Sequence, residues 1–175
     1  MKRLLLVFAC LFIGSGAFAQ KFGFVDTDYI LKHIPDYASA NKQLGVLSTQ
    51  WQKEVDNHFQ ELDRLYKSYQ HDQVLLSSDM KKKREQEIVD KEKEARDFQK
   101  QKFGPEGDLF KTRQSLIKPI QDRVFKAIQQ VADDGLYAVI FDKAGEPTML
   151  YAAPRYDKSN DVIIKLGYKP GVFAK

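Results

Sequence analysis

A long apolar stripe is the feature that most constrains this chain. From Asp36 to Tyr69, apolar side chains recur at steps of three or four residues, the spacing of one face of an α-helix. At about 1.5 Å per residue, a helix of about forty residues is about 60 Å long. Such a helix is longer than a compact domain of this size is wide. It must therefore extend away from whatever body the chain forms. The stripe consists of Leu44, Leu47, Trp51, Val55, Phe59, Leu62, Tyr66 and Tyr69.

A second helix is expected to run back along the first. The Ser-Ser-Asp sequence at residues 77–79 offers N-cap side chains, so we expect a sharp reversal there and a helix from near Met80. Its first part, Met80–Phe103, is polar nearly all round and contains nine Lys or Arg. Charge pairs such as Glu92 with Arg96 each stabilise a helix by about 0.2–0.5 kcal/mol. They can sustain this helix but cannot fold it alone, so it should be solvated.

Two breakers interrupt the returning helix. The first is Gly104-Pro105-Glu106-Gly107, which should open a kink or a looped-out turn. The second is Pro119, which lacks a backbone donor and either bends or restarts the helix. We expect Asp133-Asp134-Gly135 to end the helix, with Gly135 as a left-handed C-cap. The candidate hinges are Gly104, Pro105, Gly107 and Pro119.

Strand-forming sequence lies at both ends of this helical region. Residues 21–26 alternate as a short strand, residues 136–141 form an apolar run of strand length, and residues 148–152 follow a turn as a further strand. A short helix is expected from Asp157 to Leu166, then a loose tail. The fold class is therefore α+β: a long antiparallel helical hairpin, residues 36–133, inserted into a small sheet formed by residues 20–35 and 134–175. A body that small is marginal alone, so self-association is expected.

The first residues have the pattern of a signal peptide. Lys2 and Arg3 precede an apolar run from Leu4 to Ile13, and Ala17-Phe18-Ala19 is a small-x-small cleavage site. The run is too short to span a bilayer. We expect cleavage after residue 19 and export to the periplasm, without the only cysteine, Cys10. Removing Lys2 and Arg3 leaves 26 basic against 24 acidic residues, a balance that does not favour nucleic acid as a partner.

Catalysis is not expected. His33, His58 and His71 are isolated in the sequence, and no nucleophile, phosphate-loop or dinucleotide motif is present. Asp26 and Asp28 follow a strand, but capping of the next helix explains them better than chemistry does. We therefore expect neither an enzyme, nor a metal site, nor a cofactor.

Two functions remain for the arms. A coiled-coil scaffold with a fixed partner would need Leu or Ile at regular heptad positions, and aromatic residues occupy many of these places instead. Arms with scattered aromatic and long charged side chains can instead surround an unfolded polypeptide without demanding one sequence. Each aromatic, taken singly, can equally well pack one arm helix against the other. These side chains are Trp51, Phe59, Tyr66, Tyr69, Phe98 and Phe103.

A basic cluster marks the start of the second helix. Lys81, Lys82, Lys83 and Arg84 lie in its first turn, where the helix dipole favours negative charge. The simpler interpretation is a solvated tip without a partner. The functional interpretation is contact with anionic lipid or lipopolysaccharide head groups.

With its opening FGFVDTDYIL and the order of elements in residues 116–167, the chain resembles the Skp/OmpH family of periplasmic chaperones for outer-membrane proteins. The resemblance covers nearly all of the chain after residue 19. It implies a homotrimer in which short strands build a common body and helical arms form tentacles around a cavity. It also implies an ATP-independent holdase for unfolded outer-membrane β-barrel proteins, with possible contact to lipopolysaccharide or anionic lipid. The GPEG break departs from the simplest family pattern. The residues expected in the trimer body are Phe22, Phe24, Val139, Ile140 and Leu150.

Overall fold

The structure, a computed structural model of the chain, describes residues 20–145 and 149–174. The expected signal peptide, residues 1–19, lies outside the described residues, as does Thr148 at the start of the expected third strand. None of the helices in the described part of the chain is both long enough and apolar enough to cross a membrane.

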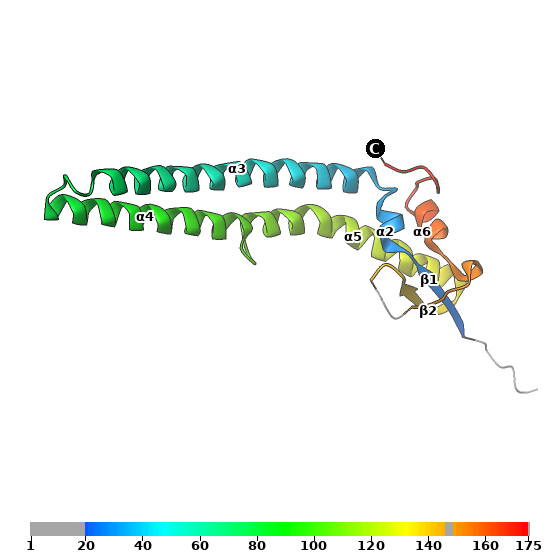
Figure 1. Ribbon diagram of the computed structural model, residues 1–175. Coiled ribbons are helices and arrows are strands. Elements are labelled where there is room, and N and C mark those ends of the chain that lie inside the picture. The colour runs from blue at the N-terminus through cyan, green and yellow to red at the C-terminus, as the bar shows by residue number, and fades with distance from the viewer. Residues whose placement is uncertain (1–19, 146–148, 175) are drawn as a thin grey trace, which may run out of the picture.

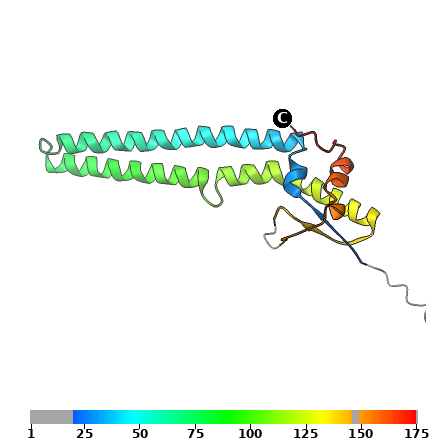
Figure 2. The same cartoon turned by 45° about the vertical axis from the view of Figure 1, so that its right-hand side comes forward.

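A long two-helix arm projects from a small body at one end (Figures 1 and 2). Helix α3, Pro35–Asp72, runs outward, and α4, Ser78–Phe103, runs back beside it. Helix α5, Asp108–Gly135, continues α4 into the body after a loop that bulges out of the arm. The long antiparallel helical hairpin is thus confirmed.

Local sequence sets where the arm helices begin. Pro35 occupies the first turn of α3, where its missing N–H leaves no hydrogen bond unmade. At the far end of the arm, the Ser77 hydroxyl accepts a hydrogen bond of 3.4 Å from the backbone N–H of Met80 and caps α4. The expected reversal and cap at residues 77–79 therefore occur as the sequence predicts.

The sheet of the body contains two parallel strands. Strand β1, Lys21–Val25, pairs with β2, Tyr137–Asp142, so that Phe24 lies opposite Phe141. Parallel neighbours need a long crossover connection, and here the whole helical hairpin is that connection. The expected α+β class, with a hairpin inserted into a small sheet, is confirmed.

Short elements complete the body around the root of the arm. Helix α2, Thr27–Leu31, follows β1, and its N-cap Asp26 accepts a hydrogen bond of 2.8 Å from the Tyr29 N–H. Asp26 therefore caps a helix, as the sequence favours. A 3₁₀ turn, Pro154–Tyr156, leads into α6, Ser159–Lys165.

The main hydrophobic core lies where α2, α5 and α6 meet the root of α3. Its members come from both ends of the chain, and they are Val25, Ile30, Leu31, Ile34, Ala40, Ile120, Val124, Ala127, Val131, Val162 and Ile163. Farther out, the buried apolar side chains among the described arm residues are Leu44, Val55 and Ala95. The arm is thus held together by far less packing than the body.

The expected strand at residues 148–152 is wrong for the part that the structure describes. Residues 149–153 have no strand conformation, and Leu150 is 94% exposed. The free edge of β1 is met instead by the next segment: the Lys158 N–H donates to the Phe24 carbonyl at 2.8 Å, and Phe24 bridges Asp157. The sheet therefore keeps two strands, with one added bridge at Phe24.

One further expectation is narrowed, and two need correction. Helix α5 runs through Pro119, so of the two forms that the sequence allowed, a bend or a restart, the restart is excluded. Gly135 is the last helical residue, and the left-handed position belongs to Leu136, with φ 52°. A Cβ at Gly135 would lie 2.3 Å from the Tyr137 ring, so a larger residue there would require that ring to move. The tail after Gly167 is not loose, because the Ala174 N–H donates to the Lys32 carbonyl at 2.9 Å.

Candidate functional site

Some of the predicted aromatic residues pack one arm helix against the other. Trp51, Phe98 and Phe103 are half-buried. The ammonium of Lys102 lies 5.0 Å from the centre of the Trp51 ring and 5.4 Å from that of Phe98, so one cation joins two aromatic faces. His58 of α3 adds a ring contact at 4.9 Å from Phe98. At this level the arm is closed by aromatic and cationic side chains.

Other aromatic residues of the arm are exposed. Phe59 and Tyr66 are exposed, and so is Phe110 on α5, which the sequence analysis did not select. The arm therefore presents aromatic surface to solvent at several places along its length.

Tyr69 joins the two helices near the far end of the arm. Its hydroxyl donates a short hydrogen bond to the Glu85 carboxylate of α4. This bond, followed by desolvation and the negative charge of Glu85, raises the pKa of the Tyr69 phenol. Tyr69 thus serves helix pairing and is not part of the exposed aromatic surface.

The loop Gly104–Gly107 is compact and sterically specified. A Cβ at Gly104 would lie 2.4 Å from the Lys100 carbonyl oxygen, and one at Gly107 would lie 2.8 Å from that of Gln101. Backbone hydrogen bonds close the loop: Gly104 N–H donates to Lys100 at 2.8 Å, and Gly107 N–H donates to Gly104 at 2.9 Å. Of the two forms that the sequence allowed, the structure has the looped-out turn, with α4 and α5 remaining in line (Figure 2).

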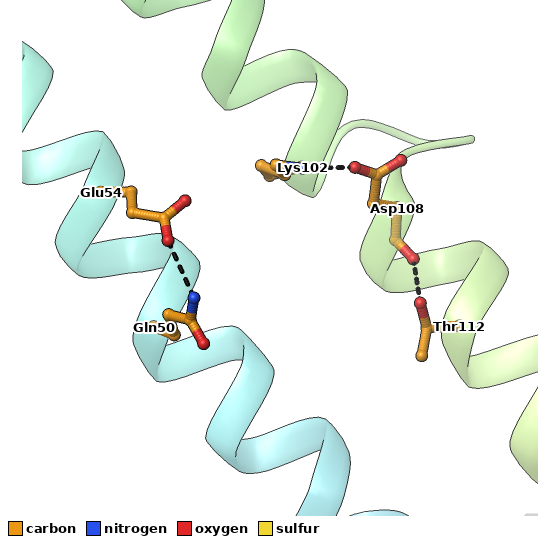
Figure 3. Close-up of polar contacts among 5 residues, drawn as sticks. All are labelled: Gln50, Glu54, Lys102, Asp108 and Thr112. Carbon is orange, nitrogen blue, oxygen red and sulfur yellow. Dashed lines mark hydrogen bonds and ion pairs between the residues drawn. The ribbon is translucent and has the colours of Figure 1, made fainter.

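An ion pair spans this loop. Lys102, at the end of α4, lies 2.6 Å from the Asp108 carboxylate at the start of α5, and both side chains are partly buried. Thr112 donates to the Asp108 carbonyl at 2.7 Å, while Gln50 and Glu54 of α3 bond each other at 3.0 Å on the facing helix (Figure 3). We call Trp51, Phe98, Lys102 and Asp108 the mid-arm latch. The sequence analysis missed Lys102 and Asp108, although both flank the GPEG break.

The root of the arm is fastened close to Pro119. Arg123 of α5 lies 2.6 Å from Asp36 in the first turn of α3, so an ion pair joins the two helices one turn beyond the proline. Both side chains are about half exposed, and such pairs contribute little to stability. Burial of Ile120 against the core fixes this part of α5 more firmly.

The far end of the arm combines cationic and apolar side chains. Arg84 is paired with Glu87 at 2.8 Å, and Lys82 and Lys83 are exposed, whereas Lys81 is half-buried. The turn between α3 and α4 presents Val74 and Leu75, more than 80% exposed, and Met80 lies beside the cations in the sequence. The sequence analysis identified the cations but not these apolar neighbours.

The sheet of the body has an uncovered apolar face. An open groove of about 730 Å³ is lined by Phe22, Phe24, Tyr137, Phe141 and Tyr151 among others. Of the predicted body residues, Phe22, Val139 and Leu150 are exposed, Ile140 is half-buried and Phe24 is buried within the chain. Four exposed or half-exposed neighbours were not predicted: Tyr137, Phe141, Tyr151 and Tyr156.

The His, Cys, Asp and Glu side chains of the described residues form no metal-binding cluster. No group of three or more His, Cys, Asp or Glu side chains lies close enough together to hold an ion within residues 20–145 and 149–174. The Asp142 carboxylate accepts from Thr27 N–H at 3.1 Å and from its hydroxyl at 2.6 Å, so it joins β2 to α2.

Comparison with known proteins fits this architecture. The family model for OmpH-like outer membrane proteins matches residues 21–166. The chain belongs to the OmpH-like family. Members of that family are chaperones and not enzymes, so the expectation of a non-enzymatic OmpH-like chain is confirmed.

A solved structure has the same fold as this OmpH-like chain. It is a candidate outer membrane chaperone (OmpH-like) from Caulobacter crescentus CB15, with a TM-score of 0.65 and 14% sequence identity. The likeness covers 91% of this chain and 92% of that one, and at this identity it concerns the fold alone. The comparison with curated proteins gives no match.

Proposed function

We propose that this OmpH-like chain is an ATP-independent periplasmic holdase that binds unfolded outer-membrane β-barrel proteins between its arms. In this proposal residues 20–35 and 134–175 form a trimerisation body and residues 36–133 form the arms. The observation that carries the proposal is the arm itself, which is long, poor in buried side chains and lined with exposed aromatic residues. Weak contacts of this kind suit a client that must later be released.

The aggregation of a urea-denatured outer-membrane barrel protein, diluted and followed by light scattering, tests the proposal. The chain should suppress aggregation of several unrelated barrel proteins, with a stoichiometry of one trimer per client. The competing function, an exported scaffold with a fixed partner, predicts no suppression of any of them.

A matched pair of variants locates the client surface. Replacing Phe59, Tyr66 and Phe110 together by Ser removes exposed aromatic area from the arm and leaves its buried side chains Leu44, Val55 and Ala95 unchanged. This triple variant should suppress aggregation much less than the wild type. Ile164→Ser, which changes an exposed apolar side chain of α6 in the body, should retain full suppression. Equal suppression by the triple variant and the wild type would place the client elsewhere.

We infer self-association from the apolar face of the sheet. Phe22 lines an apolar groove open to solvent, Val139 and Leu150 are exposed as well, and a body of this size is marginal alone. Analytical ultracentrifugation should find a trimer at micromolar concentration. Val139→Asp should dissociate it, whereas Val46→Asp on the exposed face of α3 should not. A well-folded wild-type monomer under these conditions contradicts the cage.

For the far end of the arm we propose contact with an anionic lipid surface. Val74, Leu75 and Met80 provide apolar side chains for the interface, and Lys81, Lys82, Lys83 and Arg84 provide positive charge. Replacing the four cations by Gln should weaken binding to anionic vesicles most strongly at low salt. Replacing Val74 and Leu75 by Ser should weaken binding at both low and moderate salt. Unchanged binding of the Gln variant removes the proposal.

A further inference from the structure

His33 lies at the joint between the body and the arm. It follows α2 and precedes Pro35, the first residue of α3, and its side chain is only 2% exposed. The neighbouring Ile34 is almost fully buried in the core. Any change in the His33 ring therefore acts on the segment from which the arm starts.

Both nitrogens of the His33 ring have partners that allow one tautomer. Nδ1 lies 2.8 Å from the Tyr29 carbonyl oxygen, which can only accept, so Nδ1 carries the proton. Nε2 lies 3.0 Å from the backbone N of Gly171, which can only donate, so Nε2 must be an unprotonated acceptor. The contacts thus require a neutral imidazole with its proton on Nδ1.

The partner of Nε2 belongs to a C-terminal strap, residues 169–174. The Ala174 N–H donates to the Lys32 carbonyl at 2.9 Å, and the Phe173 ring lies 4.7 Å from the His33 ring. Gly171 reaches His33 with φ 79°, a left-handed conformation that favours glycine. The strap lies beyond residue 166, where the match to the OmpH-like family model ends. In Figure 1 the C-terminal end lies beside the root of α3.

We propose that His33 is a pH-dependent switch. When neutral, it holds the strap across the α2–α3 joint, and when protonated, it releases the strap. A protonated ring would place a second N–H against the Gly171 N–H, and two donors repel each other. The open strap leaves His33 free to bind a proton and the closed strap does not. Acidification therefore favours the open form, by up to about tenfold per pH unit.

The charged groups around the joint do not offset this effect through an ion pair with the ring. Among the described residues His33 makes no ion pair. The carboxylates of the surrounding elements are used elsewhere: Asp26 caps α2, Asp36 of α3 pairs with Arg123 of α5, and Asp161 pairs with Lys158 in α6. The remaining titratable groups on α2 and the strap are Asp28, Tyr29, Lys32 and Lys169.

Hydrogen exchange of the full chain tests the His33 switch, with rates corrected for the intrinsic pH dependence of exchange. In the wild type, protection of the Gly171 and Ala174 amides should fall by up to about tenfold between pH 7.5 and 5.5, while that of β1 and β2 stays constant. His33→Gln, which cannot be charged, should show no such change between the two pH values. His71→Gln alters an exposed histidine of the arm and should respond as the wild type does.

A second measurement needs no variant. Proton–nitrogen correlation of the imidazole side chains at pH 7.5 should show His33 neutral with its proton on Nδ1. A proton on Nε2, or strap protection in the wild type that persists at pH 5.5, overturns the proposal. A strap in His33→Gln that opens on acidification as readily as the wild type overturns it as well.

Discussion

In the body, Ile30, Val162 and Ile163 have no exposed surface, whereas the arm beyond its root buries little more than Leu44, Val55 and Ala95. The body is stabilised by packing among segments from both ends of the chain. The arm depends instead on isolated contacts between two helices, such as the mid-arm latch and the Tyr69–Glu85 bond. The same chain therefore contains a cooperative body and an arm whose stability is local.

Truncation in the body core should have the largest effect. Ile163→Ala removes a fully buried side chain and should lower the free energy of unfolding by about 2–5 kcal/mol. Its neighbour Ile164 is exposed, so Ile164→Ala should change that free energy by less than about 0.5 kcal/mol. Urea unfolding followed by circular dichroism compares the two. Similar midpoints for both variants would mean that the body is not the cooperative unit.

Overpacking in the arm should have a smaller and more local effect. Ala95 has no exposed surface and faces α3, so Ala95→Leu should force the helices apart and destabilise the arm by about 1–3 kcal/mol. Hydrogen exchange should speed up in α4 and the facing part of α3 but not in β1 or β2. Lys93→Leu, on the opposite, exposed side of the same helix, is the control. Loss of protection in the sheet would show that arm and body unfold together.

Breaking the mid-arm latch should lower the free energy of unfolding less than the substitutions at Ile163 and Ala95. Lys102→Gln breaks the ion pair with Asp108 and removes the cation between Trp51 and Phe98, at a cost of about 1 kcal/mol. Because Trp51 is the only tryptophan of the chain, its emission reports on this site directly and should shift to longer wavelength. Lys118→Gln breaks an exposed pair with Asp122 that spans no loop, and it should leave the emission unchanged.

Replacing a glycine inside α3 should raise the stability of the arm, whereas the preceding substitutions lower stability. Gly45 is exposed, and a Cβ there would meet no atom within 4 Å. Gly45→Ala should therefore stabilise the arm by about 0.5–1 kcal/mol, because alanine loses less backbone entropy in a helix. Slower hydrogen exchange in the middle of α3 is the expected result. Unchanged or faster exchange there would show that Gly45 has a packing role.

Periodicity predicted the arm well because its signals are local. The spacing of Leu44, Val55 and their neighbours, the cap at Ser77 and the glycines of the loop act within a few residues, so they can be recognised without tertiary information. The α+β class followed from strand-like sequence at both ends of the chain. The same reasoning found the basic tip and the exposed aromatics Phe59 and Tyr66.

The errors occur where distant segments compete for the same partner. Residues 149–153 have a strand-like sequence but no strand conformation, and the contacts to Phe24 of β1 come from Asp157 and Lys158 instead. The tail was expected to be loose because its ordered contacts depend on His33, more than 130 residues away. Lys102 and Asp108 meet only because the loop between them is compact. None of these contacts has a local pattern in the sequence.

The smallest expected effect concerns the far end of the arm, where Tyr69 donates a hydrogen bond to Glu85. The carboxylate raises the pKa of the Tyr69 phenol above its ordinary value, so the bond stabilises the folded arm below the pKa of the unfolded phenol. That contribution is lost as the pH rises through the raised pKa of the folded state. Tyr69→Phe should speed up exchange at neutral pH only near residues 66–85 and abolish the alkaline change there. Since the contact is exposed, the body should not respond; a change in β1 or β2 would mean that the arm transmits its state to the body.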